Sequence, residues 1–344
     1  MKNLFQTTQR VLLSVAASLL ATACLTSCER TSDNVQPAPT AAAPVQDITA
    51  PQNMRGINVQ MRDGTVDFRR IHAHNFNTVR IVIDVNDYHY KNFGIGMVGS
   101  LMRQANAAGL SVVLVYYNTN FMYADRYNAN AMATAATFWV AHLPYLKSVG
   151  VPFDLNIINE PCFKNNSGYQ ISAERWRDEQ NSAVGRIHAR GFTGSIIIDA
   201  PGFGHETDFV SKQGRQVAVG SPIIFSVHVY PDSFYNGGLP ENPAKDQGFM
   251  TDLRRTAGHR VIIGEFGDSY TSNNVAHYNK TRVREFVNSA QASLADCGAI
   301  AWAWNGDGTK GLMNAGVPEH PGNPQEVARA ASYLNWIQSV VPNP

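Results

Sequence analysis

Two patterns of apolar and polar positions alternate along most of this chain: short apolar runs and longer stretches with helical spacing. The short runs are rich in Val, Ile and Leu, which is typical of strands buried on both faces of a parallel sheet. They predict eight strands, at Arg55–Gln60, Thr78–Asp84, Ser111–Asn118, Phe153–Asn159, Ser195–Ala200, Ile223–Tyr230, Arg260–Phe266 and Ala299–Trp304. The longer stretches predict helices between them, including Val98–Ala108, Ala131–Val149, Ala173–Arg190, Lys280–Ala295 and Pro324–Val340.

Eight strand–helix units in strict alternation predict an α/β fold in which a parallel sheet closes into a (β/α)8, or TIM, barrel. A doubly wound open sheet is the alternative, because it has the same alternation. Nucleotide-binding sheets of that kind carry a glycine-rich loop after the first strand, and no such loop follows Gly56-Ile57-Asn58-Val59. We therefore expect one barrel domain over residues 54–344.

The amino terminus has the pattern of a secretory signal. Lys2 and Arg10 precede the apolar stretch Val11–Ala23, and small residues follow before Cys28. This apolar stretch is too short to span a bilayer comfortably, which argues against a permanent transmembrane helix. An ordinary secretion signal cut near Ala23 is one interpretation.

A lipoprotein signal is the interpretation that we favour, because Leu25-Thr26-Ser27-Cys28 resembles the bacterial lipobox. It predicts a signal peptide at residues 1–27, then a lipidated Cys28 and a disordered linker through residue 53, rich in Pro, Ala, Thr and Gln. The protein is then expected to be secreted and anchored by its lipid on the outer face of a bacterial membrane.

Charge, cysteine positions and the absence of certain motifs limit what the protein is expected to bind. Without residues 1–27 the chain has 26 basic and 27 acidic residues, so no polyanion such as nucleic acid is expected to bind. Cys162 and Cys297 are predicted at opposite ends of the barrel, too far apart for a disulfide. HExxH, CxxC and acidic calcium-loop motifs do not occur, so we expect no metal, and we expect no other cofactor. The protein is expected to be a monomer.

Candidate chemistry lies where two predicted strands end. Glu160 follows Asn159 after the fourth apolar run, and Glu265 ends the seventh, 105 residues later. The carboxyl ends of barrel strands share one face, so these glutamates are expected to converge. Retaining glycoside cleavage needs two carboxyl groups about 5 to 5.5 Å apart, although a structural ion-pair role is the alternative.

Neighbouring strands supply polar side chains that suit this chemistry. Arg80 interrupts an apolar run, so it needs an anionic partner when buried, and a nucleophilic carboxylate is one. His228 and Tyr230 share a strand face, because strand side chains alternate, and both can bond carboxylates or sugar hydroxyls. The amide of Asn159 is suited to a sugar 2-hydroxyl.

Two tryptophans, Trp302 and Trp304, end the eighth run, and an indole at a barrel mouth is an apolar platform for a sugar ring. Either could instead fill the barrel interior. We expect Trp304 to be the platform, because it lies nearer the end of the predicted strand.

Together these motifs resemble glycoside hydrolase family 5, retaining (β/α)8 glycosidases, over nearly all of residues 54–340. The resemblance implies Glu160 as acid/base and Glu265 as nucleophile. It places Arg80, Asn159, His228, Tyr230 and Trp304 around the sugar. Many family members carry a histidine at the end of the third strand, where this chain has Tyr116-Tyr117-Asn118, and Tyr117 is its expected replacement.

The segments 198–204, 225–230 and 301–306 resemble those of compact bacterial β-mannanases. We therefore expect an endo-acting β-1,4-mannanase that binds a polysaccharide. An endo-β-1,4-glucanase of the same family is the first alternative. A surface glycan-binding lipoprotein without catalysis is the alternative from another class.

Overall fold

The structure is a computed structural model. It describes residues 51, 53–61, 66–118, 128–161, 164–165, 168–234, 238–272, 275–305 and 324–341. Residues 1–50 are outside this set, so the signal peptide, Cys28 and most of the linker remain predictions. Cys162 is outside it as well, whereas Cys297 is buried and forms no disulfide. Within the described ranges, none of the helices combines the length and apolarity that crossing a bilayer requires.

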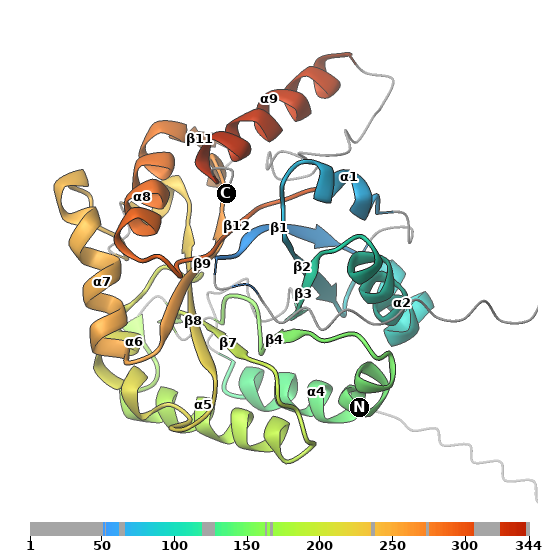
Figure 1. The fold of residues 1–344 in the computed structure, drawn as a ribbon. Helices are drawn as coiled ribbons and strands as arrows, with labels where there is room; N and C mark the ends of the chain where they lie inside the picture. Colours follow the sequence, from blue (N-terminus) through green and yellow to red (C-terminus); the bar gives the residue numbers. More distant parts are fainter. Residues whose placement is uncertain are drawn as a thin grey trace, which may run out of the picture. The chain divides into compact units, whose positions relative to one another are not determined.

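Eight parallel strands form a closed barrel, in the order β1-β12-β9-β8-β7-β4-β3-β2 (Figure 1). The prediction of a (β/α)8 barrel is therefore confirmed. The barrel strands are β1 (Arg55–Gln60), β2 (Thr78–Asp84), β3 (Ser111–Tyr117), β4 (Asp154–Asn156), β7 (Ile196–Asp199), β8 (Ile223–Val229), β9 (Arg260–Phe266) and β12 (Ala299–Ala301). Two hairpins lie outside the barrel sheet, β5 (Lys164–Asn165) with β6 (Gly168–Tyr169) and β10 (Ser269–Ser272) with β11 (Val275–Tyr278).

Helices follow the strands and lie outside the barrel (Figure 1). They are α1 (Phe68–Ala73), α2 (Tyr88–Ala107), α4 (Ala131–Ser148), α5 (Ala173–His188), α6 (Asp208–Gln213), α7 (Asp246–Ala257), α8 (Lys280–Ser293) and α9 (Pro324–Val340). Three short 3-10 helices are η1 (Gly214–Gln216), η2 (Pro231–Phe234) and η3 (Pro243–Lys245). The helix α2 starts ten residues before the predicted Val98, and non-helical backbone at Gly94 divides it.

The strands match the predicted runs closely, apart from two that end early. Strand β4 stops at Asn156 and β12 stops at Ala301, each three residues before its predicted end. In both cases the chain leaves the regular ladder at the face where the candidate site residues lie. Side chains alternate only within a regular strand, so alternation does not predict which way the residues after Asn156 and Ala301 point.

Three layers of side chains fill the barrel. Six apolar side chains form the layer nearest the strand starts: Met54, Val113, Ile197, Ile224, Ile262 and Ile300. Further along the strands comes a polar layer of Asn58, Arg80, Asn156, Asp199, His228 and Glu265, all buried. An apolar cluster of Val82, Val115, Tyr230, Trp302 and Ala303 lies beyond it, toward the strand ends, with Tyr117 packed against it. Within the described residues, the layer nearest the strand starts is therefore apolar, and the polar layer lies between it and the strand ends.

Candidate active site

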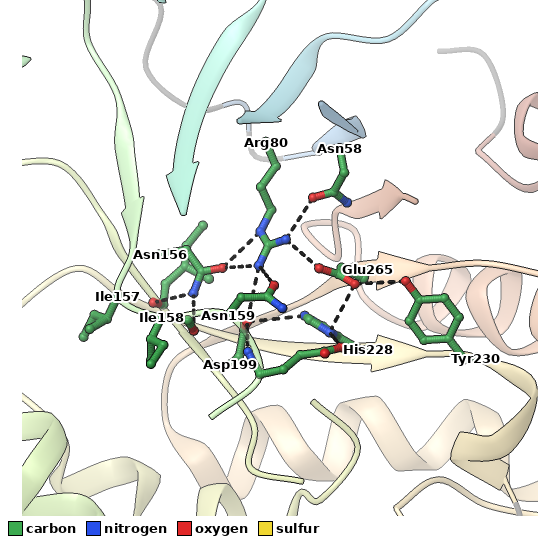
Figure 2. Close-up of polar contacts among 12 residues, drawn as sticks. Asn58, Arg80, Asn156, Ile157, Ile158, Asn159, Asp199, His228, Tyr230 and Glu265 are labelled. Carbon is green, nitrogen blue, oxygen red and sulfur yellow. Dashed lines mark hydrogen bonds and ion pairs between the residues drawn. The ribbon is translucent and has the colours of Figure 1, made fainter. Parts of the chain in front are cut away.

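Arg80 is the centre of the polar layer. Its guanidinium group donates to Asn58, Asn156, Asn159 and Glu265, as Figure 2 shows, and its Nη2 also lies 3.3 Å from Asp199 Oδ2. The side chain is 1% exposed. A buried guanidinium needs both counter-charge and acceptors for its fixed fork of N–H groups, and these neighbours provide them. The expectation that Arg80 pairs with a carboxylate is confirmed.

Glu265 is held from two sides. Arg80 Nη1 donates to its Oε1 at 2.7 Å, and the Tyr230 hydroxyl donates to its Oε2 at 2.9 Å (Figure 2). Each carboxylate oxygen of Glu265 thus accepts one hydrogen bond from a neighbouring side chain. Tyr230 is buried, and the pKa of its phenol is raised by burial and by the charge of Glu265, so it remains a donor. These two bonds hold the carboxyl group of Glu265 in one orientation.

Glu160 has a different environment. Its Oε1 lies 2.7 Å from His228 Nδ1, and its backbone has a φ of 44°, which is in the left-handed region. One ligand-type oxygen of Glu160 and one of Glu265 lie within 4.8 Å of each other, and His228 is within the same distance of both. That separation is near the 5 to 5.5 Å typical of retaining glycosidases and well below the ~6.5 Å or more of inverting ones.

Burial and charge give the groups of the site distinct protonation states. Burial and the nearby charge of Glu265 raise the pKa of Glu160 to about 7. Burial opposes charge on His228, but Glu265 and Asp199 outweigh it and raise the pKa of this imidazole to about 10. Burial also opposes ionisation of Asp199, yet His228 and Arg80 lower its pKa to about 2. Near neutral pH, Glu160 can therefore hold its proton while Asp199 is ionised and His228 is cationic.

One group of possible metal ligands occurs among the described residues. It consists of Glu160, His228 and Glu265, whose ligand atoms lie close enough together to hold a metal ion. However, the Arg80 cation already lies 2.7 Å from Glu265, and the raised pKa of His228 favours a second cation there. A divalent ion would meet both positive charges, so these residues do not suit a metal centre. That the protein needs no metal remains a prediction.

Asn159 and Tyr117 lie where the sequence placed them, at the strand-end face. Asn159 is buried, its backbone N–H donates to the Tyr116 carbonyl, and its side-chain oxygen accepts from Arg80 Nη2 at 2.7 Å. Tyr117 is half-buried and packs against the cluster that contains Tyr230 and Trp302. Asn159 directly precedes Glu160, and Tyr117 packs against the cluster whose Tyr230 contacts Glu265.

Trp304 is not where the sequence led us to expect it. It is 1% exposed and belongs to the outer core between barrel and helices, with Arg70 of α1 lying 5.5 Å from its ring centroid. Trp302 instead lies in the inner cluster with Tyr117 and Tyr230. Of the two indoles, Trp302 is therefore the one in the barrel interior near the strand ends, and Trp304 lies on the helix side.

Three buried polar residues of the site escaped the sequence analysis: Asn58, Asn156 and Asp199. Asn58 and Asn156 accept from Arg80, and Asp199 accepts the backbone N–H of Glu160. Each is a polar residue inside or at the end of an apolar run, the same signal that identified Arg80. Their importance depends on contacts across the barrel, between residues 22 to 119 positions apart.

The loop after β7 packs tightly on His228. A Cβ atom on Gly204 would come within 2.4 Å of His228 Cγ, and Gly204 has a φ of 77°. Glycine alone meets both requirements without strain. The imidazole is thus confined by backbone on one side and by carboxylates on the others.

Curated proteins with similar sequences are mannan-degrading enzymes. The chain is 26% identical over 267 residues to a mannan endo-1,4-beta-mannosidase of Streptomyces lividans, covering 74% of this chain and 62% of that protein. It is 23% identical over 261 residues to beta-mannanase/endoglucanase A of Caldicellulosiruptor saccharolyticus, covering 74% of this chain and 18% of that protein. The chain therefore spans less than two thirds of the length of these relatives.

Among solved structures, the catalytic domain of a mannanase from Streptomyces sp. SirexAA-E has a TM-score of 0.63 with this chain at 24% identity, covering 85% of each. At that identity the likeness supports the barrel fold alone. Residues 43–308 match the family described as Cellulase (glycosyl hydrolase family 5), and this chain belongs to that family.

Proposed function

We propose that the protein is a retaining endo-β-1,4-glycanase that hydrolyses β-mannan. The observation that carries this proposal is the pair of buried glutamates, with oxygens within 4.8 Å and opposite surroundings. Glu265 accepts from a cation and a hydroxyl, whereas burial and a neighbouring carboxylate raise the pKa of Glu160 to about 7. A non-catalytic glycan-binding protein has no need of such a contrast.

In the first step, Glu265 attacks the anomeric carbon while Glu160 gives its proton to the departing glycosidic oxygen. A bond forms between the sugar and Glu265, and the bond to the leaving chain breaks. In the second step, Glu160, now ionised, takes a proton from water, which attacks the same carbon and frees Glu265. The anomeric configuration is retained because it is inverted twice.

The remaining residues of the proposed site bind sugar. Trp302 offers an apolar ring face to the sugar at the cleavage point, and Tyr117 packs against the same cluster. Asn159, whose side-chain oxygen accepts from Arg80, would bond the 2-hydroxyl. Mannose and glucose differ at C2, so Asn159 and Tyr117 are the candidates for discrimination between mannan and glucan.

The preference for mannan rests on the relatives, which are named as mannosidases or mannanases. An endo-β-1,4-glucanase is the second candidate, because one relative is named both beta-mannanase and endoglucanase. Anchoring through a lipid on Cys28, with the enzyme secreted to the outer face of a membrane, also remains a proposal. It is supported by the lipobox-like sequence before Cys28.

Release of reducing ends from linear mannan, glucomannan and carboxymethylcellulose tests the substrate. A soluble form starting near residue 50 is expected to cut mannan or glucomannan at least about tenfold faster, which corresponds to about 1.4 kcal/mol in the transition state. Equal or faster cleavage of the cellulose derivative would refute the mannanase assignment. No cleavage of any of the three would favour the glycan-binding alternative.

A further inference from the structure

Asp199, the last residue of β7, occupies the centre of the contacts around Glu160. Its Oδ2 accepts the backbone N–H of Glu160 at 3.1 Å, and lies 3.3 Å from Arg80 Nη2 and 3.5 Å from His228 Nε2. The side chain is fully buried and faces the barrel interior (Figure 2). Oδ2 of Asp199 thus contacts the backbone of Glu160. It also faces Nε2 of His228, the imidazole whose Nδ1 contacts the carboxyl group of Glu160.

Glu160 needs such support because its backbone is unfavourable. A φ of 44° in a residue with a Cβ atom costs free energy and persists only where surrounding contacts enforce it. Asp199 provides the hydrogen bond to the Glu160 backbone N–H, with an acceptor that is ionised. Charged acceptors make stronger hydrogen bonds than neutral ones.

His228 transmits the second contact. Its Nε2 faces Asp199 and its Nδ1 faces Glu160 at 2.7 Å, so both ring nitrogens are turned to carboxyl groups. An imidazole in this arrangement carries both protons, and its Nδ1–H points at Glu160. Among the described contacts of Nε2, Asp199 is the charged partner. Without Asp199, this side of the ring would lose the charge that holds its orientation.

We propose that Asp199 is a positioning residue for the acid/base, holding the Glu160 backbone in its left-handed conformation and aligning His228 on the Glu160 carboxyl group. This inference rests on the proposed role of Glu160. Asp199 is 1% exposed, so it acts through the residues that it contacts rather than on the substrate. Its removal should therefore impair proton transfer more than substrate binding.

Several charged or titratable groups face this assembly from the packed elements. Arg80 approaches from β2, Glu265 from β9, and Tyr230 from the end of β8. His205 in the loop after β7 is buried, and burial together with His228 lowers its pKa to about 3, so it is neutral. Replacing Asp199 by a neutral residue removes a negative charge near Glu160 and should lower the pKa of that carboxyl group.

Asp199→Asn and Asp199→Ala separate the two contacts. Asparagine keeps an acceptor for the Glu160 N–H but loses the charge, whereas alanine loses both. Asp154→Asn is the matched control, because Asp154 is also a buried carboxylate, with its Oδ1 accepting the Ser195 N–H, but it starts β4 at the other end of the barrel. The three variants should all lose stability, and only those at Asp199 should lose turnover per folded molecule.

We expect Asp199→Asn to lower kcat on glucomannan by about tenfold or more with little change in KM, and Asp199→Ala to lower it further. The loss should be smaller on a dinitrophenyl glycoside, whose leaving group needs little protonation. The alkaline limb of kcat/KM should move to lower pH in both variants. Wild-type kcat and pH profile in either variant, or an equal loss on both substrates, would overturn the inference.

A double variant isolates the path through Glu160. If Asp199 acts through Glu160, adding Asp199→Asn to Glu160→Ala should lower kcat no further than Glu160→Ala alone. Multiplied losses would overturn the inference and leave the proposed function intact. Near-normal kcat in the single Glu160→Ala variant would instead overturn the proposed function, and the inference with it.

Discussion

Replacing Arg80 with lysine should destabilise the protein and impair catalysis together, although the positive charge is kept. The guanidinium group makes six hydrogen bonds to five side chains, those of Asn58, Asn156, Asn159, Asp199 and Glu265. An ammonium group has only three N–H donors. At least two of the five acceptors must therefore lose their donor in the lysine variant.

The magnitude follows from burial. The acceptors are buried, and each polar group left unsatisfied there costs about 1–3 kcal/mol, so the expected loss is up to about 2–6 kcal/mol. That is a large part of the ~5–15 kcal/mol by which a folded protein is stable. In the lysine variant, Glu265 either loses its 2.7 Å bond or keeps it while Asn159 and Asp199 lose their bonds to residue 80. Turnover should fall roughly ten- to hundredfold, because a hydrogen bond to a charged group contributes about 1.5–3 kcal/mol.

Urea denaturation and glucomannan hydrolysis at a temperature where the variant is folded would measure the two effects. Arg282→Lys is the matched control, since Arg282 is also buried and pairs with Asp246 through two bonds of 2.5 and 2.7 Å, away from the glutamate pair. It should lose stability and keep wild-type turnover per folded molecule. Wild-type stability and turnover in Arg80→Lys would refute the reasoning, because the donor count would then not matter.

Three further predictions concern the chemistry and the amino terminus. Glu265→Ala should lose several orders of magnitude in turnover and recover activity with azide, giving a product of inverted configuration, and azide without effect would contradict its role as nucleophile. The rate should fall as pH rises through about 7, because Glu160 must be protonated to act and its pKa is raised to about 7 by burial and Glu265. A rate that still rises at mildly alkaline pH would exclude Glu160 as the acid. Cys28→Ser should move the protein from the membrane to the soluble fraction of fractionated cells with unchanged specific activity. A wild-type protein that is already soluble would show that the lipobox interpretation is wrong.

The barrel could be predicted from the sequence because its signals are local. Strand β9 has its predicted bounds, Arg260–Phe266, since a run of apolar β-branched residues needs burial on both faces whatever its neighbours are. The same rule brings Glu160 and Glu265 to one face, because parallel barrel strands all end there. Arg80 was found because a charged residue within an apolar run needs a buried partner, and His228 because alternation puts it on the same strand face as Tyr230.

Only the tertiary structure decided which tryptophan faces the barrel interior. Alternation along a strand would give Ile300, Trp302 and Trp304 the same side, but β12 ends at Ala301 and the rule ends with it. Trp302 then joins the inner cluster and Trp304 the outer core. The contacts of Asp199 were beyond the sequence for another reason. Its partners Glu160 and Arg80 are 39 and 119 residues away, and no local pattern specifies which side chains meet across a closed barrel.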